Sequence, residues 1–398
     1  MKHKKIRILT AAALLITAFS SAIMSGCTSM KVNKILKGLE QEDTDCPEYS
    51  LEKYTANYWE GNVIYNEAVM PLEEPDGSVK PIPLLYRAEK ILSVRDSSLG
   101  TLYQEGKDYL LEDGQLVIPE GSSIKTVEYN QYYPPEDYQG PKIQKTDGSG
   151  YILWCDGFNL HQLQIAVTYI HVDKWEAAVP PAQGNTLSIT LSKLEKKEPV
   201  KILIYGDSIA SGCNSSSDTG DEPFAPKWYE MMEAALKKKY SYQDITIINT
   251  AVGGTDSAWG AQNAYNSCKV HEPDLAILAF GMNDIHTDPA DFIENIRQIM
   301  DITSLGNYDC EFVLIAPMLA NPQAGGFAGN QNFFREAMKN ANWSSANHTV
   351  IADMTTFYED LLARKRYWDM SCNNINHPND FLARGYTQLM LRTLERES

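Results

Sequence analysis

Two residues in the second half of the sequence have side chains suited to nucleophilic catalysis. Ser208 ends the run Gly206-Asp207-Ser208, directly after a short apolar stretch, and His377 lies in a polar loop just before a proline. A serine hydroxyl is a weak nucleophile until an adjacent base takes its proton, and histidine is the most common base. A serine at a strand-to-helix turn also presents its backbone N–H to a bound anion. Ser208 and His377 are therefore a candidate nucleophile and base.

Two further residues could stabilise negative charge on a reacting oxygen. Gly254 follows an apolar stretch, and a glycine there lets the backbone approach a ligand and donate its N–H. Asn283 follows another such stretch and could direct its side-chain N–H groups at an oxyanion. Each segment alone is equally consistent with a helix cap or an ordinary turn. Their combination and order along the chain indicate a catalytic site.

The four segments resemble the conserved sequence blocks of SGNH (GDSL) hydrolases, a family of serine esterases. The resemblance extends over about residues 199–398. It implies that Ser208 attacks the substrate and that His377 accepts the serine proton. It also implies an oxyanion hole formed by the backbone N–H groups of Ser208 and Gly254 and by the side chain of Asn283.

One position departs from the family pattern. SGNH hydrolases have an aspartate three residues before the histidine, and this chain has Asn374. An asparagine oxygen can accept the Nδ1–H of the histidine, but it carries no charge to stabilise an imidazolium. We expect Asn374 or a backbone carbonyl to orient His377 in a Ser–His dyad. A carboxylate from elsewhere in the chain, or an inactive domain, are the alternatives.

The surrounding sequence predicts a fold that would bring these residues together. From residue 199 short apolar stretches alternate with stretches of helical periodicity. This alternation is typical of a doubly wound α/β fold, with a parallel sheet covered by helices on both faces, here the flavodoxin-like arrangement of SGNH hydrolases. Strands are expected at 201–205, 244–248, 275–280, 312–315 and 349–352, and helices at 226–239, 289–302, 330–341, 355–366 and 379–394. Ligands bind at the carboxyl ends of such strands, where most of the candidate residues lie.

Residues 46–198 differ from this pattern and contain mainly β signals. Asp113-Gly114 lies between two apolar runs, which is a hairpin signature. Further strands are expected at 151–154, 162–169 and 186–191. We interpret this region as an all-β, jelly-roll-like domain that precedes the hydrolase domain.

The N-terminus has the features of a bacterial lipoprotein signal peptide over residues 1–26. Basic residues precede an apolar stretch at 8–23, which is shorter than the roughly 20 residues of a membrane span. Ser25-Gly26-Cys27 follows, so Cys27 is the expected site of acylation, and two acyl chains suffice for stable anchoring. Residues 27–45 would form a tether. These features predict export and anchoring at the extracytoplasmic face of the membrane; an ordinary secretory signal is the alternative.

Composition limits the possible partners. The net charge of −17 argues against nucleic acid, because phosphate binding needs a basic face. The cysteine spacing does not suggest a metal site, and we expect neither a metal nor an organic cofactor. A jelly-roll-like domain before an SGNH domain resembles two-domain bacterial carbohydrate esterases, which implies an acetylated glycan as substrate. A lipase or lysophospholipase, a cell-wall acyltransferase and a non-catalytic carbohydrate-binding surface protein are the alternatives.

Overall fold

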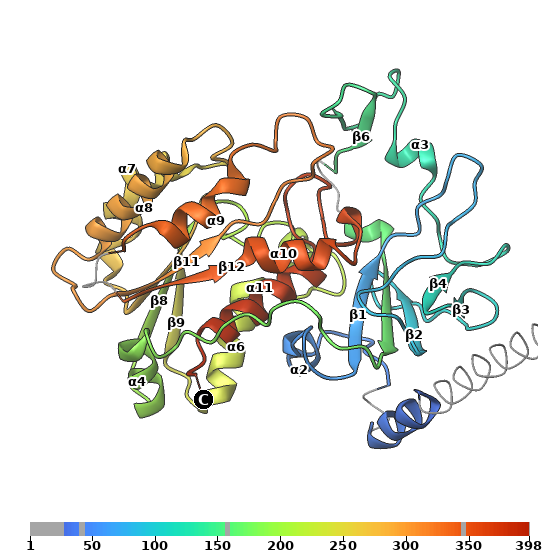
Figure 1. The fold of residues 1–398 in the computed structure, drawn as a ribbon, viewed down its shortest axis with the longest axis horizontal. Coiled ribbons are helices and arrows are strands. Elements are labelled where there is room, and N and C mark those ends of the chain that lie inside the picture. Colours follow the sequence, from blue (N-terminus) through green and yellow to red (C-terminus); the bar gives the residue numbers. More distant parts are fainter. Residues whose placement is uncertain (1–27, 40–43, 156–159, 344–347, 398) are drawn as a thin grey trace, which may run out of the picture.

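A five-stranded parallel sheet forms the centre of the C-terminal half of the chain (Figure 1). The computed structural model describes residues 28–39, 44–155, 160–343 and 348–397. The strand order is β12-β11-β10-β8-β9. Its members are β8 (Val200–Gly206), β9 (Ile245–Asn249), β10 (Leu275–Ala279), β11 (Glu311–Ala316) and β12 (Thr349–Asp353). The chain passes from β8 to the edge strand β9 and then back across to β10, so the predicted doubly wound parallel sheet is confirmed.

Helices cover both faces of this sheet. In Figure 1, α7, α8 and α9 lie together on one side, and α4, α6 and α11 lie on the other. Side chains of β8 alternate between two apolar cores: Ile202 and Ile204 pack on the α6 and α11 side, while Leu203 and Tyr205 pack on the α7 and α8 side. The helices are α6 (Trp228–Tyr240), α7 (Ser257–Ser267), α8 (Pro289–Thr303), α9 (Gln331–Asn340), α10 (Met354–Leu362) and α11 (Asp380–Thr393). Helix α7 was not predicted, because its apolar periodicity is weak.

One expected strand is a helix. Residues 186–191 were expected to be extended, but α4 spans Ser188–Lys196. Leu187, Leu191 and Leu194 recur at helical spacing and are buried. The buried carboxylate of Glu311 on β11 accepts hydrogen bonds from the first backbone N–H groups of the helix, at 2.9 and 2.8 Å. A tertiary partner therefore satisfies the N-terminus of α4, which a local pattern could not reveal.

The N-terminal half is built from antiparallel strands, as expected. Its main sheet has the order β1-β7-β2, with β7 hydrogen-bonded to both neighbours. Two separate hairpins, β3–β4 and β5–β6, complete its described strands. A jelly roll has two facing sheets. In described residues 44–155 and 160–198, the strands form one three-stranded sheet and the two hairpins. The elements are α2 (Leu51–Thr55), β1 (Val63–Val69), β2 (Lys90–Asp96), β3 (Leu110–Glu112), β4 (Gln115–Val117), α3 (Tyr129–Tyr132), β5 (Lys142–Gln144), β6 (Tyr151–Leu153) and β7 (Ile165–Ile170).

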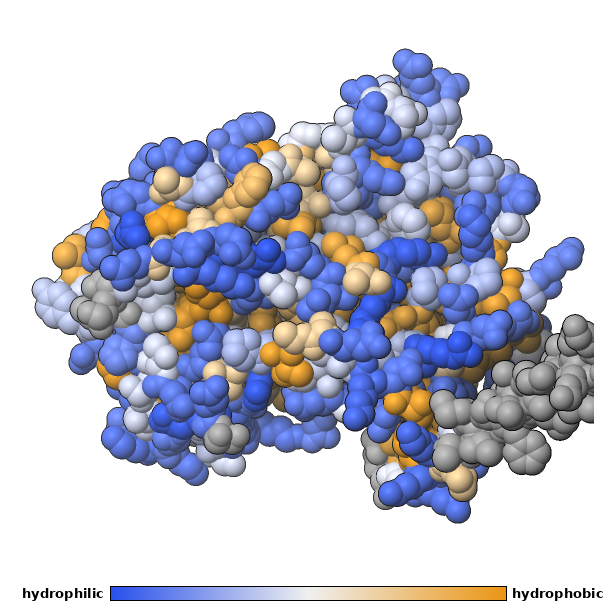
Figure 2. Space-filling model, in the orientation of Figure 1, coloured by the Kyte–Doolittle hydropathy of each residue, from blue (hydrophilic) through white to orange (hydrophobic). Residues whose placement is uncertain are grey.

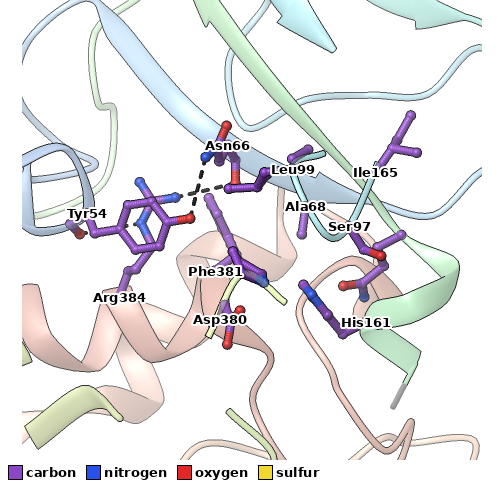
Figure 3. Close-up of a pocket in the computed structure, with 13 residues that line it drawn as sticks. Tyr54, Asn66, Ala68, Ser97, Leu99, His161, Ile165, Asp380, Phe381 and Arg384 are labelled. Atoms are coloured by element: carbon purple, nitrogen blue, oxygen red, sulfur yellow. Dashed lines mark hydrogen bonds between the residues drawn. The ribbon is translucent and has the colours of Figure 1, made fainter. Parts of the chain in front are cut away.

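The two halves share one apolar core rather than meeting at a polar boundary. Tyr58 stacks on Phe381 of α11 with ring centroids 4.5 Å apart. Arg384, only 2% exposed, donates a hydrogen bond to the backbone oxygen of Tyr65 at 2.6 Å. Figure 3 shows Arg384 next to the ring of Tyr54, and both line a small cavity together with Phe381. The N-terminal half therefore supports the C-terminal helix that follows the candidate base.

The outer surface is mainly hydrophilic on the face shown in Figure 2. Within the described ranges, no helix has both the length and the apolar character needed to cross a membrane. The expected signal peptide and its acylation site, Cys27, lie outside the described residues.

Candidate active site

Ser208 lies at the carboxyl end of β8, as the sequence predicts. The strand ends at Gly206, where an added Cβ would lie 2.1 Å from the backbone oxygen of Ala279 on β10. Only glycine allows the two central strands to approach so closely at this end. Ser208 then follows in the turn and is 6% exposed. This placement puts the hydroxyl at the point where the strand order reverses, the usual ligand site of such sheets.

The imidazole of His377 contacts the Ser208 hydroxyl directly. The Ser208 Oγ lies 2.8 Å from His377 Nε2. The loop that carries His377 is held by Asn373, whose Oδ1 accepts hydrogen bonds from the backbone N–H groups of Ile375, Asn376 and His377 at 2.9, 2.9 and 3.0 Å. The structure thus brings together the two residues that the sequence singled out, and it adds Asn373, which sequence reasoning missed. Asparagine is a common turn residue, so that signal was present but not specific.

Asn374 does not have the position expected of it. Its Oδ1 accepts a hydrogen bond from the Tyr132 hydroxyl at 2.9 Å, and its Nδ2 donates to the backbone oxygen of Leu153 at 2.8 Å. The residue is fully buried and has a left-handed backbone, with φ of 65°. Both polar atoms of the side chain are therefore used to bind the N-terminal half. The expectation that Asn374 orients His377 is corrected on this geometry.

Asn214 takes that place. Its Oδ1 is hydrogen-bonded to His377 Nδ1, so Nδ1–H donates and Nε2 is left to accept the serine proton. Asn214 also has a φ of 65°, and its backbone N–H donates to Asp218 Oδ2 at 3.1 Å. Asp218 in turn forms an ion pair with Lys227 at 2.6 Å. The sequence offered no specific signal for Asn214, which lies in one of several polar stretches.

Burial sets the protonation state of the base. Desolvation lowers the pKa of His377 to about 4, and the Asp218 carboxylate opposes this shift. The imidazole is therefore neutral at neutral pH and can accept a proton. Burial has the opposite effect on the carboxyl group of Asp207, whose pKa is raised to about 7. Asp207 Oδ1 accepts a hydrogen bond from the backbone N–H of Ile209 at 2.9 Å, which shapes the turn around Ser208.

The two expected oxyanion donors beyond Ser208 lie on adjoining loops. A Cβ added to Gly253 would lie 3.6 Å from the Ser208 Cβ, so the Gly253-Gly254 turn passes beside the nucleophile. Gly254 has a φ of 78°, which favours glycine. Asn283 Nδ2 donates one hydrogen bond to the backbone oxygen of Thr255 at 3.0 Å, which ties Asn283 to this turn and leaves its second N–H available. The arrangement can supply N–H groups to an oxygen bound near Ser208.

Asp284 accepts hydrogen bonds from the backbone N–H of Ser257 at 3.1 Å, so it links the end of β10 to the start of α7. In the part of the chain that the structure describes, no group of three or more His, Cys, Asp or Glu side chains could hold a metal ion. The six described cysteines are free thiols.

Comparison with protein families agrees with this geometry. Residues 204–384 match the GDSL-like Lipase/Acylhydrolase family. These residues form a GDSL-like lipase/acylhydrolase domain. The match begins within β8 and ends within α11, so it includes Ser208, Gly254, Asn283 and His377. No curated protein matches the chain in sequence.

Several solved structures resemble part of this chain. A two-domain esterase (CEX) active on acetylated mannans, co-crystallized with mannopentaose, is 22% identical, with a TM-score of 0.43 over 53% of this chain and 53% of that chain. Axe2, an acetylxylan esterase from Geobacillus stearothermophilus, is 13% identical, with a TM-score of 0.40 over 50% and 95%. A GDSL-like lipase from Parabacteroides merdae is 19% identical, with a TM-score of 0.38 over 49% and 96%. The present chain spans about half the length of the mannan esterase.

Proposed function

We propose that this protein is a serine ester hydrolase in which Ser208 attacks the ester carbonyl. The observation that carries the proposal is the 2.8 Å contact between Ser208 Oγ and the neutral His377 Nε2. His377 accepts the hydroxyl proton as Oγ bonds to the carbonyl carbon. The carbonyl oxygen becomes an oxyanion, which the N–H groups of Ser208, Gly254 and Asn283 stabilise.

Collapse of this tetrahedral intermediate completes the first half-reaction. The bond to the alcohol breaks, His377 returns its proton to the alkoxide, and the acyl group stays on Ser208. Water then attacks the acyl-enzyme, with His377 again taking a proton, and the carboxylic acid leaves as Ser208 is regenerated. Asn214 holds the imidazole in the tautomer that both steps require.

We extend the proposal to short acyl groups, and to acetyl groups on carbohydrate in particular. A small cavity lined by Asp207 and Ile209, the sequence neighbours of Ser208, has a volume of about 10 Å³. Such a space holds about one water molecule. Trp228, Phe280 and Tyr386 pack around it. A long acyl chain would need a tunnel that these side chains fill, which favours acetyl over fatty acyl esters.

The experiment compares p-nitrophenyl acetate, butyrate and octanoate with acetylated mannan and acetylxylan, on which the two esterases above act. We expect kcat/KM to fall from acetate to octanoate. We expect Ser208→Ala to lower kcat by about a thousandfold or more, while the exposed Ser78→Ala serves as the control. A folded Ser208→Ala variant that keeps more than a few per cent of turnover would refute the nucleophile. A kcat/KM that rises with chain length would refute the acetyl preference.

We further propose that Cys27 anchors the enzyme to the membrane. The support is the order of segments at the N-terminus, where basic residues are followed by an apolar stretch and then by Ser25-Gly26-Cys27. Membrane fractionation of Cys27→Ser and the mass of the N-terminal peptide test it. A lipidated peptide in the wild type and release of the variant are expected, whereas an unlipidated N-terminus with unchanged membrane association would contradict it.

A further inference from the structure

A second concave site lies where the two halves of the molecule meet, and the catalytic steps above do not use it. The cleft has a volume of about 430 Å³, within the range of small-molecule sites. Tyr129, Tyr133 and Lys145 line it from the N-terminal half, and Arg366 and Trp368 line it from the C-terminal half. We call this site the aromatic cleft.

The lining of the aromatic cleft combines flat apolar faces with polar edges. The rings of Tyr129 and Tyr133 lie 4.9 Å apart between centroids with an interplanar angle of 42°. Pro81 and Pro83 add further apolar surface. Aromatic side chains of this kind present an apolar body with a polar tip. A pyranose ring has the matching division, because C–H groups occupy its faces and hydroxyl groups its edge.

Three of the five charged side chains that line the aromatic cleft are paired within the protein. Glu74 pairs with Lys80 at 2.8 Å, and Arg366 pairs with Asp369 at 2.9 Å. Lys145 Nζ lies over the ring of Tyr133, 4.4 Å from its centroid. A phosphate or nucleotide would need cations that are free to form charge-assisted hydrogen bonds. A neutral ligand rich in hydroxyl groups fits this lining better.

Helix α3 connects the aromatic cleft to the active-site loop. Tyr132 lies between the two cleft tyrosines in the sequence and is fully buried. Its hydroxyl group donates a hydrogen bond to the side chain of Asn374, three residues before His377. Trp368 meets the ring of Tyr132 edge-on at 5.2 Å. In Figure 1, α3 lies at the top of the N-terminal half, beside β6. The cleft is therefore built on the segment that holds the loop of the catalytic base.

We propose that the aromatic cleft binds sugar units of a carbohydrate chain whose ester lies at Ser208, an inference that rests on the proposed function. A sugar ring packs on Tyr129, and its hydroxyl groups bond to polar groups at the rim. The cleft then contributes affinity for oligomers that a small ester cannot gain.

The test compares an acetylated hexasaccharide of mannose or xylose with p-nitrophenyl acetate. For Tyr129→Ala we expect KM for the hexasaccharide to rise about tenfold, with kcat little changed, because ring packing is lost. Kinetics on p-nitrophenyl acetate should stay at the wild-type level. Tyr129→Phe keeps the ring and should keep most of the affinity. The control is Tyr308→Ala, at a tyrosine that is 77% exposed elsewhere on the surface. The proposal would be overturned if Tyr129→Ala left KM unchanged for both hexasaccharides. It would also be overturned if the variant lost kcat/KM equally on the hexasaccharides and on p-nitrophenyl acetate.

A binding measurement separates this inference from the proposed activity. The Ser208→Ala protein is titrated with deacetylated hexasaccharides of mannose and xylose, and binding is measured by isothermal titration calorimetry. If one of these hexasaccharides binds and Tyr129→Ala weakens its binding, the result supports the proposed sugar site, even if the wild-type protein hydrolyses none of the esters. Ester hydrolysis that depends on Ser208, without any such binding, supports the activity and refutes the cleft.

Discussion

The hydrogen bond between His377 Nδ1 and Asn214 sets which ring nitrogen faces Ser208. An amide oxygen can hold the tautomer, but it cannot supply the charge that a carboxylate gives to a developing imidazolium. Asp218 supplies negative charge at longer range, and it also accepts a hydrogen bond from the Asn214 backbone. The orientation and the electrostatic support of the base thus come from two different residues.

Replacing Asn214 tests its orienting role. Glycine tolerates the left-handed backbone at this position, so Asn214→Gly removes the side chain with little strain. We predict a loss of kcat of about tenfold, the scale of one neutral hydrogen bond. Asn374→Gly is the matched control, because Asn374 has the same φ of 65°. That variant leaves the Tyr132 hydroxyl unpaired, so it should lose stability while kcat of the folded protein changes less. Steady-state kinetics and thermal melting of both variants distinguish the two roles. A larger kcat loss for Asn374→Gly than for Asn214→Gly would identify Asn374 as the orienting residue.

The pH dependence of activity follows from the depressed pKa of His377. The base acts in its neutral form, so activity falls as pH decreases through the pKa of His377. That pKa is about 4, rather than the usual 6.5, so kcat/KM should stay nearly constant from pH 7 to about pH 5. Asp218 raises this pKa against the effect of burial, so Asp218→Asn should move the acid limb to still lower pH. The exposed Asp309→Asn is the control. An acid limb near pH 6.5 in the wild type would contradict this description.

At the scale of elements, the loop between η4 (Tyr367–Asp369) and α11 is closed on itself. The backbone N–H of Cys372 donates to the backbone oxygen of His377 at 2.9 Å, and Ser371 pairs with Pro378 as a β-bridge. Asn373 fills the interior of the loop with its three accepted hydrogen bonds. Asn379 caps α11 by accepting a hydrogen bond from the backbone N–H of Leu382 at 3.1 Å. The loop therefore places His377 before substrate binds.

Asn373 is the residue on which this loop should depend most. In Asn373→Ala three N–H groups lose their acceptor, and the loop can shift relative to Ser208. A displacement of about 1 Å at a reacting group can cost on the order of 100-fold, and we predict a kcat loss of that order. Asn373→Asp keeps the accepting oxygen and should keep most of the activity. Equal kcat values for the alanine and aspartate variants would show that these hydrogen bonds do not position the base.

At the scale of the whole molecule, a buried ion pair joins the two halves. Lys365, which follows α10, pairs with Glu67 of β1, and both side chains are fully buried. Glu67 also accepts hydrogen bonds from the Tyr169 hydroxyl at 2.7 Å and from the backbone N–H of Leu85 at 2.8 Å. The pair therefore lies inside a continuous polar network within the shared core. Removing one charge would leave the other unpaired in an apolar environment.

We predict that Lys365→Met lowers the free energy of unfolding by about 3–5 kcal/mol, the usual cost of breaking a buried pair. Lys80→Met, which removes an exposed ion pair with Glu74, should change stability little. Urea denaturation of both variants provides the measurement. Because the core is continuous, spectroscopic signals from the two halves should be lost at the same urea concentration in Lys365→Met. Similar midpoints for the two variants would argue against a structural role for the buried pair.

The sheet and most of its helices were predictable because each strand is a local apolar run and each helix a local periodicity. The strand expected at 186–191 was wrong because the buried Glu311, distant in sequence, satisfies the N-terminus of α4. The small main sheet of the N-terminal half was also beyond the local pattern. Strand alternation indicates which residues face a core, but not how many strands pair.

The sequence alone singled out Ser208, Gly254, Asn283 and His377, because their chemistry requires particular residue types. The first three follow predicted strands, and His377 precedes a predicted helix. The sequence could not identify the partner of His377 Nδ1. Asn214 and His377 lie 163 residues apart, and their contact exists only once the loops after β8 and before α11 meet above the sheet. The neighbouring Asn374 turns its side chain to Tyr132 instead. Long-range packing, and not spacing along the chain, decides which of several chemically equivalent asparagines orients the base.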